Sequence, residues 1–464
     1  MSKMLVMKFG GTSIGSPPAI RQVIEIARSA KVDWDNVAIV VSAMSGVTDT
    51  LLDGAASSLD DETAAPRAAE TLRQKHFTAL DELAPMADDV RALIDGYLDE
   101  YVALCQAIHV LGEASPRALD AISSLGERMS APLVAAALSA ADVSAEAVDT
   151  RTVVVTDDVY QRASPLMDET AARCEAIIQP FFANGSIPVL TGFTGATRQG
   201  VTTTLGRGGS DFSGAIFGVA LDADEVWIWT DVTGVMTADP RVIKSAHTIP
   251  VLTFKEISEL AFYGAKVLHP KAIRPVLEHG MKLWVKNTFA PTERGTLIVP
   301  DNGQRTDGRI RAVTAFKGQC IITLEGRGML GVPGIAARTF AAVARTNTNV
   351  VMISQASSEQ SICFVVSCQS SEMVLRMMEE EFRLELSRKD IDSITSSGES
   401  AIVTVVGAGM RHTLGIAGKV FSALGETGVN VIAIAQGSSE CSISLVVDAG
   451  DANEAVAAIH VLII

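Results

Sequence analysis

Short apolar runs and longer segments of helical periodicity alternate along the first 300 residues. The apolar runs cover residues 4–9, 37–41, 153–155, 187–191, 226–229 and 283–286. Between the first two runs, Ile20, Val23, Ile24 and Ala27 recur at the spacing of one helix face. Strands without polar alternation, separated by helices, predict a mainly parallel sheet that helices cover on both faces.

Helix-forming and charged residues fill positions 60–125 almost without a break. This stretch predicts a helical insertion that covers one side of the sheet. The alternation ends near residue 298, and the polar, glycine-rich stretch PDNGQRTDGRIR follows at residues 300–311. We interpret residues 1–300 as one domain and residues 301–311 as a linker.

The rest of the chain contains an internal duplication. Residues 334–366 match residues 415–447 at a constant offset of 415 − 334 = 81, which places Gln355 opposite Gln436. Each copy reads as a helix, a strand, a short turn and a second strand, which predicts two similar modules. We place these modules at residues 312–395 and 396–464. The polar residues after a buried strand in each copy predict a small-ligand pocket or, alternatively, an interface between paired sheets.

Composition narrows the class of protein. The net charge of −16 leaves no basic stripe, which argues against a nucleic-acid partner. No signal peptide precedes the first strand, and no apolar run reaches the roughly 18 residues that a membrane helix needs. We therefore expect a cytoplasmic protein with no membrane association. The six cysteines form no CxxC pair and no zinc spacing, so we interpret all of them as reduced, mostly buried thiols.

The segment TTTLGRGGSD at residues 202–211 combines three features that suit an anionic ligand. Its glycines at 206, 208 and 209 allow backbone amides to converge on an anion. Arg207 offers a planar fork that matches a carboxylate or a phosphate. Ser210 and Asp211 begin a helix, and helix N-termini attract anions. Taken alone, the segment is equally consistent with an ordinary helix cap.

Two further strand ends carry candidate chemistry. Lys8 precedes Gly10 and Gly11 at the end of the first strand, a phosphate-loop arrangement that is not a Walker A motif. The second strand leads into a small polar loop at residues 42–48. In parallel sheets, ligand sites lie at such carboxyl ends. Glu127 lies farther along the chain beside Arg128, and by itself this pair reads as an exposed ion pair.

Five motifs together resemble those of the aspartokinase family. They are KFGGTS at residues 8–13, SLGERMS at 124–130, TTTLGRGGSDFSG at 202–214, WTDVTGVMTADPR at 229–241 and FYGAKVLHP at 262–270. The two C-terminal copies resemble paired ACT domains, so the resemblance spans the whole chain. It implies an amino-acid-kinase fold, a three-layer αβα sandwich with a mainly parallel sheet, followed by two α+β ferredoxin-like ACT domains. It also implies that one ACT module is inserted into the other.

The resemblance implies an aspartate kinase that phosphorylates the β-carboxylate of L-aspartate to 4-phospho-L-aspartate. This is the first step of lysine, threonine and methionine biosynthesis. ATP would be the donor, with Mg²⁺ bound mainly through the ATP phosphates. We expect a monofunctional chain, because no residues after Ile464 remain for the homoserine dehydrogenase that some relatives carry. We also expect a homodimer or tetramer formed through the ACT domains.

The resemblance also implies roles for individual residues. Lys8, Asp211 and Lys266 would form the catalytic centre, where Lys8 neutralises charge on the transferred phosphoryl group. Arg207 would bind the α-carboxylate of aspartate and Glu127 its α-ammonium. The aspartate site would be completed by Ser42, Thr48 and Ser210. The nucleotide site would consist of Lys8, Phe9, Gly10, Gly11, Thr230, Asp231, Met236, Arg241, Lys266 and Val267, with backbone donors from the two glycines.

One position departs from the family pattern. The family commonly has tyrosine where this chain has Met236, so the ring contact to the nucleotide is replaced by a thioether that can pack against adenine. We expect catalysis to survive this change with weaker binding of ATP.

The segments ISQASSE at residues 353–359 and IAQGSSE at 434–440 look more like threonine-inhibited members than lysine-inhibited ones. We therefore expect feedback inhibition by L-threonine, with L-lysine as the alternative effector. The effector site would be formed by Asn349, Ile353, Gln355, Asn430, Ile434 and Gln436. Inhibition would correspond to a coupling free energy between the two parts of the chain of about 1–3 kcal/mol.

Two other functions compete with this interpretation. The first is another kinase of the same fold that acts on glutamate, carbamate or a nucleotide. Arg207 together with Glu127 argues against it, because a zwitterionic substrate needs one cation and one anion. The second is a non-catalytic amino-acid sensor. The presence of Lys8, Arg207 and Lys266 argues against a sensor, because a chain released from catalysis need not keep charges that are costly to bury.

Overall fold

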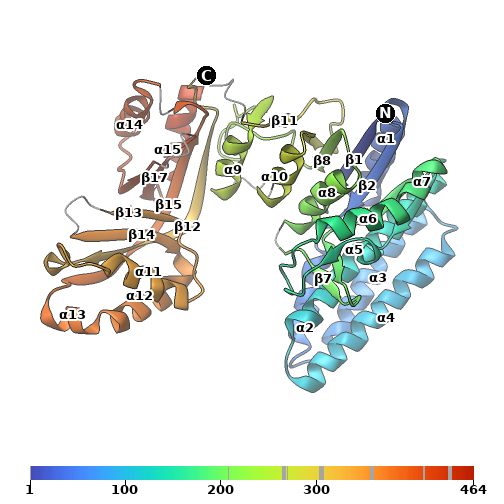
Figure 1. The fold of residues 1–464 in the computed structure, drawn as a ribbon, viewed down its shortest axis with the longest axis horizontal. Coiled ribbons are helices and arrows are strands. Elements are labelled where there is room, and N and C mark those ends of the chain that lie inside the picture. Colours follow the sequence, from blue (N-terminus) through green and yellow to red (C-terminus); the bar gives the residue numbers. More distant parts are fainter. Residues whose placement is uncertain are drawn as a thin grey trace. The chain divides into compact units, whose positions relative to one another are not determined.

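The computed structural model describes residues 2–206, 208–263, 268, 270–301, 308–355, 360–410, 413–436 and 441–463. The chain divides into two compact units (Figure 1). Unit 1 comprises Met1–Val235, Thr248–Phe254 and Val267–Pro300. Unit 2 comprises Met236–His247, Lys255–Lys266 and Asp301–Ile464.

Unit 1 is built on an eight-stranded sheet with the strand order β3-β5-β2-β1-β8-β10-β11-β9. The strands from β3 to β10 in this order run parallel, whereas β10 and β11 pair antiparallel. The prediction of a mainly parallel sheet is confirmed. The strands are β1 (Met4–Phe9), β2 (Asn36–Val41), β3 (Ala145–Val148), β5 (Ile187–Thr191), β8 (Glu225–Thr230), β9 (Val251–Thr253), β10 (Lys282–Asn287) and β11 (Thr296–Val299).

The apolar run at residues 153–155 does not join this sheet, contrary to the prediction. A short 3-10 helix, η1 (Thr150–Thr152), turns the chain away, and Val153 and Val154 are buried without strand geometry. The backbone then pairs in a separate three-stranded sheet of β4 (Val155–Thr156), β6 (Thr194–Thr197) and β7 (Thr202–Thr204). Continuous apolar character therefore reports burial here and not membership of the main sheet.

Helix α1 (Pro17–Asp33) begins where Ser16 accepts a hydrogen bond from the backbone of Ala19, and it buries the predicted apolar face. The stretch that was predicted to be helical forms long helices (Figure 1). They are α3 (Ala64–Leu83), α4 (Asp88–Leu111) and the start of α5 (Pro116–Ala140), whereas α2 (Val47–Ser57) precedes this stretch. The remaining helices of unit 1 are α6 (Met167–Ile177), α7 (Gln179–Ala183), α8 (Gly209–Ala220) and α10 (Pro270–Glu278).

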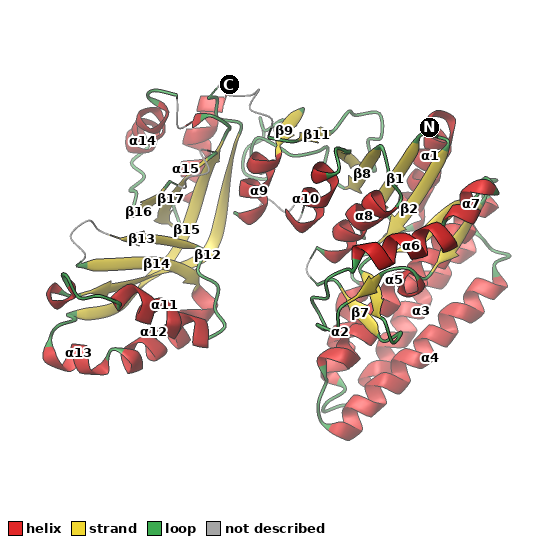
Figure 2. Cartoon of the chain, viewed as in Figure 1, coloured by secondary structure: helices red, strands yellow, loops and turns green. Residues whose placement is uncertain are grey.

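Unit 2 contains a six-stranded antiparallel sheet with the order β13-β14-β12-β15-β17-β16. The order is symmetrical, because each repeat supplies one outer pair and the strands that precede the repeats, β12 and β15, lie side by side at the centre (Figure 2). The strands are β12 (Ala312–Glu325), β13 (Met352–Gln355), β14 (Ser361–Ser367), β15 (Ser393–Val406), β16 (Ala433–Ala435) and β17 (Ser442–Asp448). Each repeat shows the predicted helix, strand and strand.

The helices of unit 2 pack against this sheet. Successive residues along β12 and β14 point to opposite faces of the sheet. Ile322 and Phe364 pack with the helices, whereas Ile321 and Val365 belong to a smaller apolar cluster. The helices are α9 (Phe254–Phe262), α11 (Ile335–Arg345), α12 (Cys368–Glu381), α13 (Arg383–Arg388), α14 (Ile416–Glu426) and α15 (Ala452–His460), with the 3-10 helices η2 (Arg327–Met329) and η4 (Val461–Ile463).

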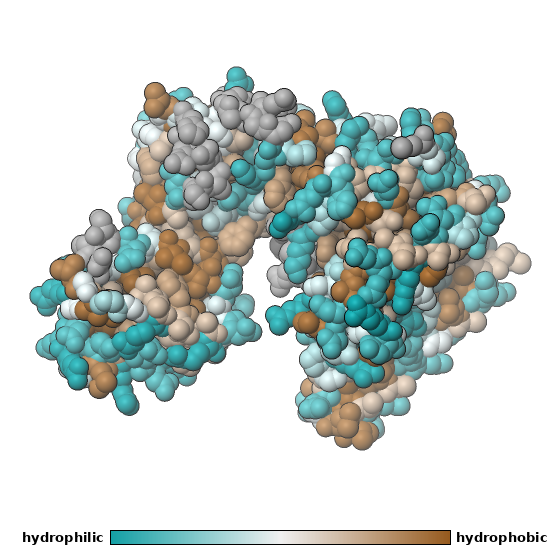
Figure 3. All heavy atoms as spheres, viewed as in Figure 1, coloured by the Kyte–Doolittle hydropathy of each residue, from teal (hydrophilic) through white to brown (hydrophobic). Residues whose placement is uncertain are grey.

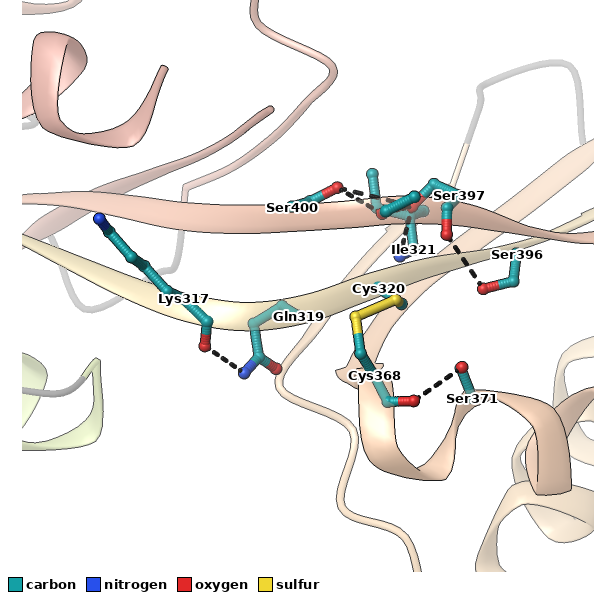
Figure 4. The surroundings of a disulfide bond; sticks show 10 residues. Lys317, Gln319, Cys320, Ile321, Cys368, Ser371, Ser396, Ser397 and Ser400 are labelled. Atoms are coloured by element: carbon teal, nitrogen blue, oxygen red, sulfur yellow. Dashed lines mark hydrogen bonds between the residues drawn. A yellow bond between two sulfur atoms is a disulfide. The ribbon is translucent and has the colours of Figure 1, made fainter. Parts of the chain in front are cut away.

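The prediction that all six cysteines are reduced is wrong. Cys320 on β12 and Cys368 at the start of α12 form a disulfide (Figure 4). The other four, Cys105, Cys174, Cys363 and Cys441, are free. The pair is 48 residues apart and lies in two different elements of unit 2, so the approach of the two thiols depends on the packing of α12 beside β12. Spacing along the chain could not reveal it.

The surface of the molecule is mixed in character. Figure 3 shows hydrophilic and hydrophobic side chains interspersed over the face in view. Scattered exposed apolar residues are normal for folded proteins. Over the described ranges, none of the helices combines the length and the apolar character that crossing a bilayer requires.

We predict that the disulfide stabilises unit 2. Closing a loop of this length removes entropy from the unfolded chain worth up to about 4 kcal/mol. Reduction with dithiothreitol should therefore lower the melting temperature of the unit 2 transition in calorimetry. The variant Cys320→Ser/Cys368→Ser should melt at the temperature of the reduced protein whether or not reductant is present. Alkylation of six cysteines, and not four, in the denatured, unreduced protein would contradict the disulfide.

Candidate active site

A pocket of about 820 Å³ lies in unit 1. Its walls come from the end of β1, the β2–α2 connection, the first half of α5 and the segment that joins β7 to α8. Strands β2 and β8 flank β1 on opposite sides, and the pocket lies where these parallel strands end. Ligands of open α/β sheets bind at such a point. The predicted residues Lys8, Ser42, Thr48, Glu127, Ser210 and Asp211 all line this pocket.

Lys8 is a buried lysine, 6% exposed, on the central strand β1. Its ammonium lies 2.5 Å from a carboxylate oxygen of Asp211, in the first turn of α8. Helix α8 can approach β1 closely because Gly214 faces Lys8: a Cβ at Gly214 would lie 3.2 Å from the Lys8 Cβ. One turn later, a Cβ at Gly218 would lie 2.6 Å from the Val226 side chain on β8. The glycines therefore bring Asp211 to Lys8.

The glycine-rich loop has the backbone that its sequence predicts. Gly206 and Gly208 have positive φ angles of 76° and 73°, a conformation that favours glycine. A Cβ at Gly206 would also lie 2.7 Å from the carbonyl oxygen of Gln161. Gly208 is the N-cap of α8 and has no side chain that could bind the first amides of the helix. The Gly209 N–H donates to the Gly206 carbonyl, so the amides that follow it are the ones that can serve an anion. Arg207, the predicted carboxylate clamp, lies outside the described residues.

Glu127 is buried on α5, 3% exposed, which corrects the reading of an exposed Glu127–Arg128 pair. One of its oxygens accepts a long hydrogen bond of 3.5 Å from the Ser210 hydroxyl. Its other oxygen, Oε2, is buried and has no hydrogen-bond partner among the described residues. Burial raises the pKa of Glu127 to about 8, although the Ala43 backbone and the Lys8 ammonium act in the opposite direction. A buried carboxylate of this kind calls for a cationic ligand.

Arg128, the neighbour of Glu127 in the sequence, points to different partners. Its guanidinium contacts the carboxylates of Glu100 and Asp149 and lies 4.3 Å from the ring centre of Tyr97. It therefore binds α5 to α4 and to the segment before η1. The helix separates a structural cation from a carboxylate that faces the pocket.

The loop after β1 is held by neighbouring strands. The N–H of Gly10 donates to the Trp229 carbonyl at 3.1 Å, so the donor role implied for Gly10 is already occupied by β8. A Cβ at Gly11 would lie 2.9 Å from the Ala43 carbonyl oxygen, and the Gly11 carbonyl accepts a hydrogen bond from Ser45. Phe9 is fully buried and stacks on the Trp229 ring. Phe9 therefore packs against the strand residue, Trp229, to which the loop is hydrogen-bonded.

The predicted nucleotide residues fall into both units. Thr230 ends β8, and its hydroxyl donates to the exposed Asp231 at 3.1 Å. Met236 and Arg241 belong to a segment of unit 2. There the Arg241 guanidinium forms an ion pair with the nearby Asp239, with 2.7 Å between Nη2 and Oδ2. Lys266 and Val267 lie outside the described residues. The nucleotide site therefore stays a prediction. In the ranges that are described, no group of three His, Cys, Asp or Glu side chains is arranged to hold a metal ion.

Sequence reasoning missed several residues that line the pocket, notably Asp120, Gln161, Phe193 and Thr204. Asp120 is a carboxylate that is 1% exposed, and burial raises its pKa while hydrogen bonds from Thr204 and Gln161 lower it. It lies seven residues before Glu127 and therefore on the same helix face. This spacing is the one signal that could have found it.

Unit 2 contains a second pocket, of about 340 Å³. It is lined by the η2–α11 connection together with Gln355 and Ile362 of β13 and β14. Of the six predicted effector residues, Gln355 lines this pocket. The other five are exposed at the surface of the unit and do not line it: Asn349, Ile353, Asn430, Ile434 and Gln436.

The chain matches known protein families over most of its length. Residues 3–287 match the profile of the amino acid kinase family, and residues 322–382 and 403–461 match that of an ACT domain. A bifunctional aspartokinase/homoserine dehydrogenase of Daucus carota is 34% identical over 98% of this chain. The chain spans about half the length of the curated bifunctional relatives it matches, 50% for this protein. An aspartokinase of Schizosaccharomyces pombe is 31% identical over 98% of this chain and 92% of its own length.

Solved structures agree with this assignment. Aspartokinase III of E. coli in complex with aspartate and ADP superposes with a TM-score of 0.82 at 29% identity, covering 99% of each chain. The same enzyme in complex with lysine and aspartate superposes with a TM-score of 0.79 at 30% identity, again over 99% of each chain. With its pocket at the carboxyl ends of β1 and β2 and its duplicated second unit, the chain therefore belongs to the amino acid kinase family and, within it, to the aspartokinases that carry ACT domains.

Proposed function

We propose that this chain transfers the γ-phosphoryl group of ATP to the β-carboxylate of L-aspartate and forms 4-phospho-L-aspartate, the first step of lysine, threonine and methionine biosynthesis. The observation that carries the proposal is that a buried lysine, Lys8, and a buried acid, Glu127, line the same pocket. Among the described residues, one oxygen of Glu127 has no partner and could meet a cation, and Lys8 supplies positive charge for an anion. L-aspartate carries both an ammonium and two carboxylates.

The substrate would require little covalent help from the protein. The β-carboxylate of aspartate is ionised at neutral pH and is itself the nucleophile, so no general base is needed. What the protein must supply is alignment and compensation of negative charge. Asp211 holds the Lys8 ammonium, which has three N–H donors and retains two for other oxygens. Lys8 would thus meet the transferred phosphoryl group in a fixed position.

Binding of the aspartate zwitterion would use both ends of the pocket. Glu127 would accept hydrogen bonds from the α-ammonium, with Ser210 beside it. Arg207 would bind the α-carboxylate, close to the first amides of α8. Helix α2 also begins at the pocket, where Thr48 and Ser42 would complete the site. The positive ends of two helices favour an anionic substrate in this pocket.

The nucleotide would bind at the ends of β1 and β8. Gly11 would offer a backbone donor to the phosphates, and Thr230 and Asp231 would contribute from the end of β8. Met236, Arg241, Lys266 and Val267 stay predicted nucleotide residues. Mg²⁺ would be bound mainly through the ATP phosphates, and it would neutralise their charge during transfer. The exposed carboxylate of Asp231 has the oxygen chemistry that Mg²⁺ prefers.

Unit 2 would bind an inhibitory amino acid. The pocket beside Gln355 has room for one, and its backbone turns at Gly331 and Gly334 have positive φ angles that favour glycine. The sequences around Gln355 and Gln436 favour L-threonine, while the E. coli relative has been solved with lysine. We therefore propose L-threonine as the effector and keep L-lysine as the alternative.

Unit 2 would also form the contact between copies of the chain. Strands β13 and β16 are the two edges of its sheet, and among the described residues neither is hydrogen-bonded to a further strand. Ile353 on β13 is 51% exposed and Ile434 on β16 is 47% exposed. Folded proteins usually cover apolar edge strands, and pairing with a second copy does so.

The first test is ATP turnover with L-aspartate, with the acyl phosphate trapped as its hydroxamate. We expect hydroxamate to form, and L-threonine but not L-lysine to suppress it. Lys8→Met should lower kcat by about 100-fold or more, because it removes a fixed charge from the transition state. Lys3→Met, the same change at an exposed lysine nearby, should leave kcat unchanged. Suppression by lysine alone would overturn the choice of effector, and absence of hydroxamate would overturn the kinase.

The pKa of Glu127 predicts a pH dependence. Its raised pKa of about 8 means that the carboxyl group is protonated in most free molecules at neutral pH. Since aspartate binding needs the ionised form, kcat/KM for aspartate should rise with pH through about 8. Glu127→Gln should lose this rise and lower kcat/KM about 10- to 100-fold. Glu113→Gln, at an exposed glutamate, should retain the profile. A profile that is flat between pH 6 and 9 would contradict the role of Glu127.

The edge strands predict self-association. Light scattering should give two or four times the chain mass of 48.9 kDa. Ile353→Lys should shift the population toward the single chain, because a charged edge resists pairing. Val110→Lys, at a position that is 83% exposed on α4, serves as the matched control and should keep the native mass. A wild-type protein that remains a single chain at micromolar concentration would rule out this contact.

A further inference from the structure

Asp120 accepts hydrogen bonds from two segments that lie far from it in the sequence. Its carboxylate binds the backbone N–H of Thr204 at 3.1 Å and the Thr204 hydroxyl at 2.6 Å. It also accepts the backbone N–H of Gln161, at 3.0 and 2.9 Å from its two oxygens. Both oxygens are therefore occupied within the protein. Asp120 lines the pocket without offering a free oxygen to a ligand.

The two bound segments support the glycine-rich loop directly. Thr204 is the last residue of β7, two positions before Gly206. Gln161 belongs to the turn at residues 157–164, and its carbonyl packs against Gly206 so closely that a Cβ there would lie 2.7 Å away. The Thr204 carbonyl accepts the N–H of Ala163 at 2.9 Å, which joins the turn to the strand. Asp120 thus fixes both walls of the bend from which the loop begins.

The described residues that follow Gly206 contact the charged side chains of the pocket. The N–H of Gly209 donates to the Gly206 carbonyl at 2.8 Å, and α8 starts there. Ser210 then contacts Glu127, and Asp211 contacts Lys8. A shift of Thr204 would therefore move the partners of both Glu127 and Lys8.

Helix α5 carries Asp120 and Glu127 on the same face, two turns apart. One rigid helix therefore sets both the acid that faces the pocket and the start of the loop opposite it. We propose that Asp120 is a positioning residue: by holding Thr204 and Gln161, its carboxylate fixes the position of Gly206 and of residues 208–211 relative to Glu127 for binding of the amino-acid substrate. This inference rests on the proposed kinase function for its kinetic consequence, and on the hydrogen bonds alone for its structural one.

A residue that only stabilises the fold would act differently from one that positions the loop. Loss of a purely structural contact lowers the fraction of folded protein and leaves the KM values of the folded fraction alone. A displaced loop instead raises the KM for the substrate that the loop holds and spares the other substrate. The two KM values can therefore separate these roles.

The variant Asp120→Asn keeps the shape of the side chain but presents an NH₂ group where one oxygen accepted hydrogen bonds. We expect the KM for L-aspartate to rise about tenfold or more while the KM for ATP stays within about twofold, because misplaced binding groups lose much of their effect. Asp157→Asn is the matched control. Asp157 lies in the same 157–164 turn, and the partners of its carboxylate among the described residues are two local N–H groups, those of Val159 and Ser164. Its KM values should match the wild type.

A double-mutant cycle tests whether Asp120 acts through Thr204. Thr204→Val removes the hydroxyl donor with little change in shape and should raise the aspartate KM in the same way. The double variant Asp120→Asn/Thr204→Val should raise the aspartate KM no more than the more severe single variant does, since both changes break the same contact between Asp120 and Thr204. If Asp120→Asn fails to fold, Thr204→Val alone carries the kinetic test. Additive effects, equal rises in both KM values, or an unchanged aspartate KM would overturn the inference.

Hydrogen exchange gives a readout that does not depend on activity. In Asp120→Asn, peptides that cover residues 157–164 and 203–209 should exchange faster, while a peptide from β2 (Asn36–Val41) keeps its protection. If the wild type forms no hydroxamate, the proposed function fails, and this exchange result still decides whether Asp120 holds the loop. Unchanged exchange in both segments would overturn the positioning role even in an active kinase.

Discussion

The site in unit 1 depends on the close contact between helix α8 and the central strands β1 and β8. Gly214 and Gly218, one turn apart, contribute no side chains of their own, so the side chains of Lys8 and Val226 pack directly on the helix backbone. This contact brings the first turn of α8 to the end of β1, where Asp211 meets Lys8. A buried lysine is costly without a partner, so the packing of two glycines is what makes the charge at the bottom of the pocket tolerable.

Much of the fold and part of the site follow from local sequence. Apolar runs are enough to predict the parallel sheet, and helical periodicity is enough to predict α1. A strand that is buried on both faces is apolar throughout, whereas a helix that is buried on one face repeats its apolar residues at helical spacing. Lys8 and the glycine-rich loop could be found because the ends of parallel strands converge. The run at residues 153–155 misled the prediction, since apolar character alone does not state which sheet a strand joins.

Other features could not be predicted because they depend on contacts between distant segments. The sequence around Glu127 and Arg128 reads as an ion pair, yet the helix turns the two charges to different partners. Asp120 has no motif of its own and acquires its meaning from Thr204, 84 residues away. The link between Cys320 and Cys368 likewise arises from the packing of α12 beside β12. In each case the decisive information is an approach in space: the seven-residue spacing of Asp120 and Glu127 indicates a shared helix face but not the contact with Thr204.

The sheet of unit 2 joins its two repeats more tightly than the duplicated sequence suggests. Strands β12 and β15 each contain 14 residues and pair with each other along most of their length. Each outer pair of strands is bonded to one of them. Neither repeat therefore owns a complete sheet, and the boundary between the copies is not a place where the molecule can be divided. Recombination between relatives would therefore have to exchange both repeats together, because an exchange at the boundary between them would separate β12 from β15.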